Sequence, residues 1–158
     1  MPIDTYVKFE GVEGESQHKD HKGEVDVLSW SWGVSNAGTG HVGGGSGAGK
    51  AQPADLHFTH NYDKASPLLA KKCAQGVHFP TVVLAARKSG EGQQDFLKIT
   101  MKEVFITSVA PSGSGGDIVE SVSMSYGQID FSYKQQNAAG GLGGEVKFGW
   151  NVKTSVIT

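Results

Sequence analysis

The feature that most constrains this chain is a glycine-rich segment, residues 33–49, which holds eight glycines in 17 residues and follows a strand-like stretch. It is too long for a hairpin turn, and its glycines make it too plastic to fold on its own. In the preceding residues, 26–32, side chains alternate between two faces. The expected faces are Leu28, Trp30 and Trp32 on one side and Val27, Ser29 and Ser31 on the other. A compact domain that keeps such a segment is expected to dock it on a partner, which indicates an assembly subunit rather than an enzyme.

The size and composition predict one domain without disulfide bonds. The chain has 158 residues, enough to bury a core, and no linker divides it, so we expect residues 1–158 to form a single domain. Its net charge is −2, and only one of its 14 basic residues is an arginine, Arg87, which disfavours binding to nucleic acid. The single cysteine, Cys73, permits no internal disulfide, as expected for a protein made in the cytoplasm.

The hydropathy pattern predicts neither a signal peptide nor a membrane segment. The first six residues have no basic region and no apolar region. No run approaches the roughly 18 apolar residues of a membrane span. We therefore expect no stable membrane insertion, and a protein that leaves the cell, if at all, by a route without a cleaved leader.

Alternation with a period of two predicts a mainly β protein. The expected strands are residues 5–9, 25–32, 54–60, 82–87, 96–109, 118–134 and 145–156. The sixth is unusually long, and we expect a β-bulge in it at Gly127. Strands at regular spacing together with one short helix indicate a closed barrel or a sandwich.

One short helix is predicted at residues 67–75. Ser66 is the expected N-cap, Pro67 takes the first helical position, and Gly76 ends the helix. About three turns are too few to be stable alone, so the helix must pack on the sheets. The residues expected to make that contact are Leu68, Leu69 and Cys73.

Residues 44–50 resemble a nucleotide-binding motif but lack two of its features. Residues 44–50 match the first seven positions of a phosphate-binding loop, but the eighth, which should be serine or threonine, is Ala51. The loop should also open a helix, whereas Gln52 and Pro53 lead into a strand. We therefore expect no nucleotide and no other cofactor.

No spacing of residues in the sequence indicates a metal site or a catalytic site. His18, Asp20 and His21 are close together, but no further ligands follow with metal-like spacing, so we expect a solvated loop. His57 and His60 fall on opposite faces of one strand by parity. The serines lack a strand–turn–helix elbow, and the cysteine lies on an apolar helical face without an obvious base. The sequence predicts no enzyme.

Several stretches together resemble the haemolysin-coregulated protein (Hcp) family. They are residues 26–33 (DVLSWSWG), 43–50 (GGGSGAGK), 55–59 (DLHFT), 63–67 (DKASP), 79–80 (FP), 102–104 (KEV) and 149–151 (GWN). Any one of these would be weak, but the combination is specific and covers essentially the whole chain.

The resemblance implies two packed antiparallel sheets that form a β-barrel, with the short α-helix on its side and the glycine-rich segment as a long extended loop. It implies homohexameric rings that stack into the inner tube of the bacterial type VI secretion system. A spike protein then sits at the tube tip, and a contractile sheath around the tube drives its secretion in virulence and interbacterial competition. Small effectors can be held and protected in the ring lumen.

Two sets of residues become candidate contacts if the chain forms such a ring. Small side chains would keep the lumen open and contact effectors, and the candidates are Val27, Ser29 and Ser31. The loop would make ring or stacking contacts, and its candidates are Gly38, Thr39, Gly40, His41, Gly43, Gly44, Gly45, Ser46, Gly47, Ala48, Gly49 and Lys50.

Other interpretations of the same residues stay open. The small face of residues 26–32 also fits the solvent side of a half-buried sheet, and the sequence alone favours that interpretation over a lumen. The chain could be a monomeric β-sandwich binding module for a small ligand, with the glycine segment as its recognition loop, or a hydrolase with an unrecognised site. Native mass in solution separates the ring, a sixfold species, from the monomeric module.

Overall fold

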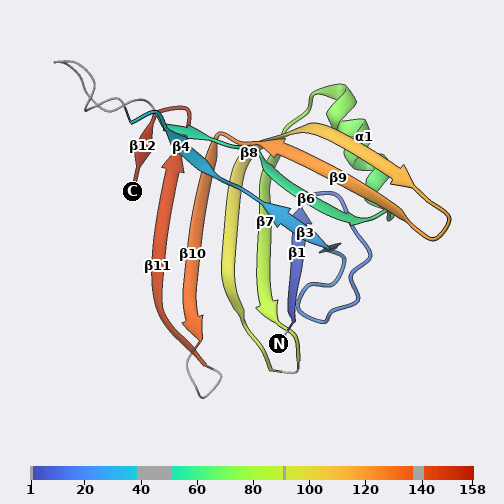
Figure 1. Cartoon of the computed structure of the whole chain (residues 1–158), viewed down its shortest axis with the longest axis horizontal. Helices are drawn as coiled ribbons and strands as arrows, with labels where there is room; N and C mark the ends of the chain where they lie inside the picture. The colour runs from blue at the N-terminus through green and yellow to red at the C-terminus, as the bar shows by residue number, and fades with distance from the viewer. Residues whose placement is uncertain (1, 39–50, 91, 137–140) are drawn as a thin grey trace.

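The structure, a computed structural model, describes residues 2–38, 51–90, 92–136 and 141–158. Figure 1 shows strands arranged in sheets, one helix beside them, and an arm that projects from one end. The elements are β1 (Ile3–Phe9), β2 (Val25–Val27), β3 (Ser29–Ser31), β4 (Val34–Asn36), β5 (Ala51–Pro53), β6 (Leu56–Asn61), α1 (Ser66–Gln75), β7 (Phe79–Lys88), β8 (Asp95–Gly113), β9 (Ile118–Ser125), β10 (Gln128–Gln136), β11 (Leu142–Asn151) and β12 (Val156–Ile157).

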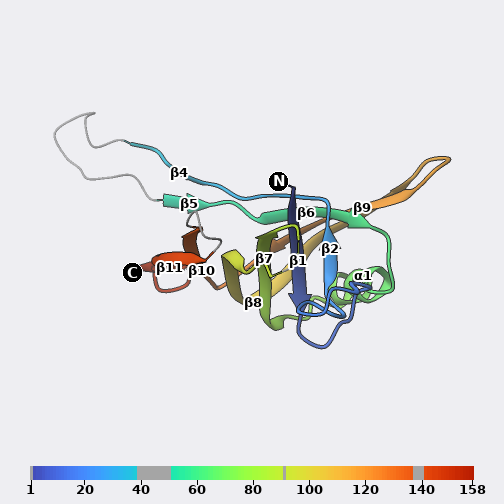
Figure 2. The same ribbon diagram turned by 90° about the horizontal axis from the view of Figure 1, so that it is seen from below.

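Two antiparallel sheets share the long strand β8. The long sheet has the order β12-β11-β10-β8-β7-β1-β2, and the short sheet joins β3, β6, β9 and the second half of β8. β8 bends between the two at Glu103, whose φ of 52° lies in the left-handed region. On the opposite side the chain passes from β2 into β3. The pairings therefore run in a circuit around the core, and Figure 2 shows the two layers edge-on. The predicted mainly β fold of two packed antiparallel sheets with one helix is confirmed.

The predicted strand at residues 25–32 is divided at Leu28, where the chain turns from one sheet to the other. Val27 packs against the core before the turn, and Trp30 packs against it after the turn, so the alternation shifts by one residue. Leu28 itself is 58% exposed. The prediction that Leu28 shares the tryptophan face is wrong, and so is the prediction that Val27 shares the face of the serines. Each sheet needs its own inward side chains, and a change of sheet resets the parity.

The predicted strand at residues 118–134 is likewise two strands, with the change of sheet at Gly127. The Gly127 amide donates hydrogen bonds to the carbonyls of Lys102 (3.0 Å) and Glu103 (3.2 Å). A Cβ at this position would lie 2.6 Å from Oε2 of Glu103 and 3.2 Å from Cε of Lys153, so a larger residue would have to displace this ion-paired couple. The interruption was predicted at the right residue, but it is a corner of the fold rather than a bulge within one strand.

The core lies between the two sheets and is almost wholly apolar. Its largest fully buried side chains come from both layers: Phe58, Leu56 and Met124 from the short sheet, and Phe79, Leu84, Ile99, Met101 and Ile129 from the long one. Phe9 contacts Phe58 and Phe79, with ring centroids 6.0 and 5.1 Å apart. These tilted aromatic contacts join the two sheets.

Helix α1 differs from its prediction at the N-terminus and at one of its packing residues. The N-cap is Ala65 rather than the predicted Ser66, and no side chain caps the helix. In the turn before the helix, Asp63 Oδ1 accepts a hydrogen bond from the Ala65 amide (2.9 Å). Gly76 ends the helix in the left-handed conformation with φ 65°, as predicted. Leu68 is 43% exposed because it lies one position, and so about 100°, away from the buried Leu69.

We expect Leu69→Ala to lower the free energy of unfolding by about 2–5 kcal/mol. The side chain is fully buried in the main core cluster, so its removal leaves a cavity where the helix meets the sheets. Denaturant titration measures the loss, with Leu68→Ala as the matched control on the exposed side, expected to change stability by less than about 1 kcal/mol. Equal losses for the two variants would contradict the packing described here.

Candidate assembly and cargo surfaces

The outward side of the short sheet is lined by small hydroxyl side chains and one histidine. We call this surface the hydroxyl face; it consists of Ser29, Ser31, His57, Thr59, Ser121 and Ser123. Strand register aligns these residues in two rows, because Ser29 lies opposite Thr59 and Ser31 lies opposite His57. Ser29 Oγ and Thr59 Oγ1 are 2.6 Å apart, and His57 Nδ1 is 2.9 Å from Ser123 Oγ. Part of the hydrogen-bonding capacity of the hydroxyl face is thus used in bonds between neighbouring strands.

The two outer faces of the molecule differ in charge. The hydroxyl face contains no lysine, arginine, aspartate or glutamate, and Asp55, at its border, accepts a hydrogen bond from Thr107 (2.8 Å). The outward side of the long sheet instead carries both signs of charge, from Lys98, Lys102, Asp130, Lys134, Glu145 and Lys147. Two walls of one barrel therefore present different chemistry, one neutral and one charged.

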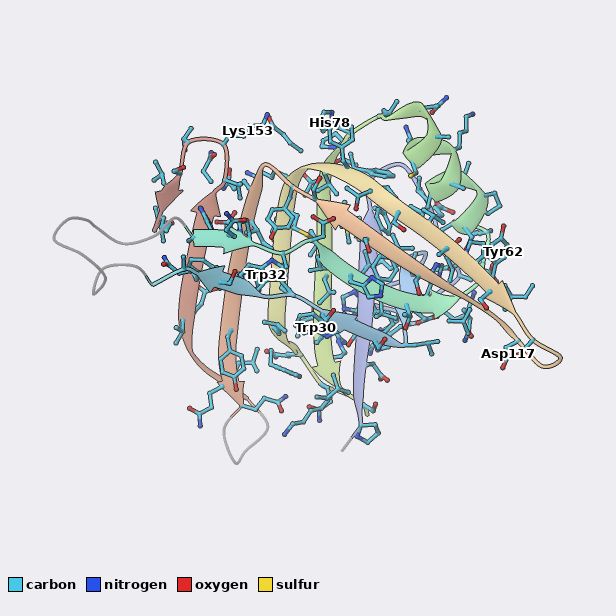
Figure 3. All side chains as sticks on the ribbon, turned by 45° about the horizontal axis from the view of Figure 1, so that its top comes forward. Trp30, Trp32, Tyr62, His78, Asp117 and Lys153 are labelled. Carbon is cyan, nitrogen blue, oxygen red and sulfur yellow. The ribbon has the colours of Figure 1, made fainter. Side chains whose placement is uncertain are left out.

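The tryptophans lie on the opposite side of β3 from the serines, as predicted. Figure 3 labels both on the segment that leads from the barrel toward the arm. Trp30 and Trp32 are partly buried and pack against the core. Trp32 contacts Phe131 of β10, with ring centroids 4.8 Å apart. Its Nε1 donates a hydrogen bond of 2.5 Å to the Tyr126 hydroxyl, which lies at the end of β9.

The arm consists of β4 and β5, and most of the glycine-rich segment lies in the chain between these strands. The two strands pair with each other, Val34 opposite Pro53 and Asn36 opposite Ala51, and Figure 2 shows them on the side of β10 and β11. Of the predicted contact residues in this segment, the structure describes Gly38, whose amide donates to Asn36 Oδ1 (3.0 Å). The others, Thr39, Gly40, His41, Gly43, Gly44, Gly45, Ser46, Gly47, Ala48, Gly49 and Lys50, lie outside the described residues.

Opposite ends of the molecule expose apolar side chains. At one end, β10 and β11 extend the long sheet beyond the barrel, and the core-facing pair Phe131 and Phe148 continues into Tyr133 and Val146, which are 46% and 70% exposed. We call this the β10–β11 end. At the other end, near the β8–β9 hairpin, Tyr62 and Ile118 are 43% and 51% exposed. Figure 3 places Tyr62 at that far side, and we call it the hairpin end. The sequence analysis missed both ends, although the alternation at 131, 133, 146 and 148 could have indicated the first.

One of the two predicted loop histidines, His21, lies between two carboxylates. His21 stacks on Tyr6, with centroids 4.5 Å apart, and its two ring nitrogens lie 3.0 Å or less from carboxylate oxygens of Glu24 and Asp95. Arg87 donates to the same Asp95 (2.7 Å) and to Asp20 (2.9 Å), fastening the loop over β1. Burial disfavours the charged carboxylate of Asp95, but its bonds to Arg87 and His21 lower its pKa overall. The solvated loop predicted here is therefore partly buried, because Tyr6 and Arg87 supply partners that sequence spacing does not reveal.

Neither the metal nor the nucleophile candidates converge on a site. No cluster of metal-ligating side chains occurs in the part of the chain that the structure describes. His57 and His60 point to opposite faces of β6, as predicted: His57 reaches Ser123 and His60 is fully buried. Cys73 is half-buried on α1. The phosphate-loop match at residues 44–50 lies outside the described residues.

A buried ion pair lies beneath the hydroxyl face. His60 on β6 is opposite Glu120 on β9, and Nε2 is 2.7 Å from Glu120 Oε1. Its Nδ1 lies 3.7 Å from Asp63 Oδ2, which is an ion-pair distance rather than a hydrogen bond. Burial disfavours the charged imidazolium, but the interactions with Asp63 and Glu120 outweigh it and raise the pKa of His60. The parity of β9 could have revealed this pair, since Glu120 shares its side with Val122 and Met124.

We expect the stability of the protein to fall as the pH rises through the raised pKa of His60. The folded state favours the charged imidazolium of His60. Its contribution to stability is therefore complete below the pKa of the unfolded state, about 6.5, and is lost as the pH rises through the higher pKa of the folded state. Each unit by which the folded pKa exceeds the unfolded pKa corresponds to about 1.4 kcal/mol of stability. Urea titrations from pH 6 upward measure the loss, and His60→Gln should remove this pH dependence, whereas His57→Gln should keep it. An unchanged slope in His60→Gln would assign the effect to another group.

The comparisons with known proteins agree with this architecture. Residues 6–133 match the family described as "Type VI secretion system effector, Hcp". The chain is 45% identical to protein hcp1 of Pseudomonas aeruginosa over 160 aligned positions, which cover 99% of each chain. The crystal structure of Hcp1 from Salmonella typhimurium superposes with a TM-score of 0.84 at 34% identity, covering both chains fully. A structure described as a type six secretion system protein superposes with a TM-score of 0.93 at 30% identity, covering 99% of this chain and 100% of the other.

A protein with this fold and these relatives is of the structural, secreted class found in the type VI secretion system. The chain belongs to the Hcp family. It is accordingly a secreted tube protein of that system. No helix in the described part of the chain is long and apolar enough to cross a membrane.

Proposed function

We propose that the chain forms homohexameric rings, that the rings stack into the inner tube, and that the lumen carries and protects small effector proteins. The tube has a spike protein at its tip and lies inside a contractile sheath. The subunits are made in the cytoplasm and leave it without a cleaved signal peptide when the sheath contracts. Membership of the Hcp family supports the tube role.

The observation that carries the ring is the pair of unlike apolar ends on one subunit. The β10–β11 end is an uncovered sheet face with Tyr133 and Val146, and the hairpin end projects Tyr62 and Ile118 on the far side. Contact between different surfaces of identical subunits is heterologous, and it closes into a ring when the rotation per subunit is a fraction of a full turn. Burying these side chains against a second copy also removes apolar surface from water.

The hydroxyl face is the proposed lumen wall. Ser29 and Ser31 are exposed, small and uncharged, so they leave the bore open and offer hydrogen bonds to many protein surfaces. Val27, predicted with them from the sequence, lies on β2 of the long sheet and packs against the core, so it is not part of this face. The loop from Gly38 to Lys50, in the chain between the two strands of the arm, is the proposed ring or stacking contact.

Native mass spectrometry of the purified protein, together with negative-stain electron microscopy, tests the proposal. A species of six subunits and ring-shaped particles are the expected results. A monomer at concentrations up to the millimolar range would contradict the ring and favour the alternative, a monomeric β-sandwich module for a small ligand. In that case the hydroxyl face would be an ordinary solvated surface.

A further inference from the structure

We propose that the Tyr126 hydroxyl is the positioning group that fixes the direction of the β4–β5 arm relative to the barrel, so that its loss impairs assembly more than folding. This inference rests on the proposed assembly function of the arm. It is carried by one hydrogen-bonded group at the point where the arm leaves the barrel.

A single phenol oxygen joins both strands of the arm to the barrel. The indole Nε1 of Trp32, two residues before β4, donates to the Tyr126 oxygen (2.5 Å). The Tyr126 hydroxyl donates in turn to the carbonyl of Ala54, the residue after β5 (2.6 Å). The directions are forced, because an indole nitrogen can only donate, a carbonyl can only accept, and a phenol has one proton. One hydroxyl therefore makes both bonds. An aromatic side chain without a hydroxyl, such as phenylalanine, can make neither.

The barrel side of this contact is rigid. Tyr126 is 9% exposed, and it precedes Gly127, whose amide is bonded to two carbonyls at the bend of β8. Burial raises the pKa of Tyr126, although the bond from Trp32 opposes the rise, so the hydroxyl stays protonated and able to donate near neutral pH. The anchor is thus a fixed corner of the fold with a permanent donor.

Apart from this contact, the arm side has one further directional bond nearby: Asp55, two residues after β5, accepts a hydrogen bond from Thr107 of β8 (2.8 Å). β4 and β5 pair with each other and with no further strand in the described chain, and all three residues of β4 are exposed. The bond from the Ala54 amide to the Gly33 carbonyl (2.8 Å) closes the arm on itself. Trp32 and Ala51 pack against the core, but apolar packing is not directional, whereas hydrogen bonds weaken steeply with angle.

An arm held in one direction has already lost the orientational freedom that binding would otherwise remove. A ring with one arm per subunit avoids this entropic cost at every interface. A substitution that loosens the arm therefore weakens every interface of the ring. Replacing Tyr126 by phenylalanine keeps the ring that packs in the core and deletes the oxygen that aims the arm. We expect the concentration needed for half-maximal ring formation to rise at least about tenfold, the equivalent of one such bond.

The test compares Tyr126→Phe with Tyr6→Phe, a tyrosine that is also buried but stacks on His21 away from the arm. Ring mass is measured over a range of protein concentrations. Arm direction is measured separately, as the distance distribution between spin labels on Ser35→Cys and Lys98→Cys, in a Cys73→Ser background diluted into unlabelled protein. The expected result is a broadened distribution and weakened assembly in Tyr126→Phe, with neither change in Tyr6→Phe.

The outcomes separate this inference from the proposed function. If the parent protein forms rings and Tyr126→Phe forms them at the same concentration, or with an unchanged distance distribution, the positioning role is overturned and the ring stands. If the parent forms no rings, the assembly function itself fails. A Tyr126→Phe variant that merely loses stability, with a narrow distribution, also overturns the proposal.

Discussion

Val146→Glu is expected to yield a folded subunit that no longer assembles into rings. Val146 is 70% exposed on β11, opposite Tyr133, so a longer charged side chain displaces no core atom. In the proposed ring the same position lies against a neighbouring copy, where an unpaired carboxylate would lose its hydration. The cost is several kcal/mol at each interface, repeated around the ring. Native mass should therefore shift from six subunits to one, while the circular dichroism spectrum and the free energy of unfolding of the monomer stay close to those of the parent.

Ile3→Glu is the matched control for this change. Ile3 is an exposed β-branched residue, 55% accessible, at the start of β1 on the opposite end of the long sheet from β11. The same charge there should leave the ring mass unchanged. Loss of the ring in both variants would mean that added negative charge, rather than the β10–β11 end, is responsible. Intact rings in Val146→Glu would place the subunit interface elsewhere.

Alternation in the sequence was sufficient to predict most strands, because a half-buried sheet imposes its period on the residues directly. It failed at two corners, Leu28 and Gly127, where the chain changes sheets. At each corner the chain passes from one sheet to the other, so a different set of positions faces the core. The alternation of apolar residues alone does not reveal where that change occurs. Gly127 indicates an interruption in the sequence, because a glycine inside a strand pattern is typical of a bulge or bend. Leu28 carried no such indication and was assigned to the wrong side.

The candidate surfaces were predictable to the extent that they follow from parity. The positions of Ser29 and Ser31 on one face, and of Trp30 and Trp32 on the other, follow from alternation within β3 and the residue after it. The pairing of His60 with Glu120 and the contact of Tyr126 with Trp32 join segments 60 and 94 residues apart. Such contacts depend on strand order, which the sequence pattern leaves undetermined. For that reason the sequence indicated the wall of the proposed lumen but not the anchor of the arm.

Ser31→Gln and Ser31→Glu are expected to preserve the fold and the ring but to lower the amount of effector that the ring retains. Ser31 is exposed on β3, the edge strand of the short sheet, and lies opposite His57 of the hydroxyl face, so a larger side chain adds bulk without entering the core. In a ring every subunit contributes the same position, and the added atoms narrow the bore all the way around. Both variants share the crowding, whereas only Ser31→Glu adds a charge to a surface that carries none.

Co-purification of a cognate effector with parent and variant rings, with ring mass measured on the same samples, separates the possible outcomes. Thr100→Gln is the control, because Thr100 is a strand hydroxyl residue on the outward side of the long sheet, away from the proposed lumen. Retention should fall in both Ser31 variants and stay unchanged in the control, and a lower level in Ser31→Glu than in Ser31→Gln would show that neutrality matters besides width. Full retention in both would move the effector contact away from this strand, and loss of the ring would place Ser31 in a subunit interface. Because the hydroxyl face is uncharged, effector retention by the parent ring should also change little between low and high salt, as expected for contacts made by hydrogen bonds between neutral groups rather than by ion pairs.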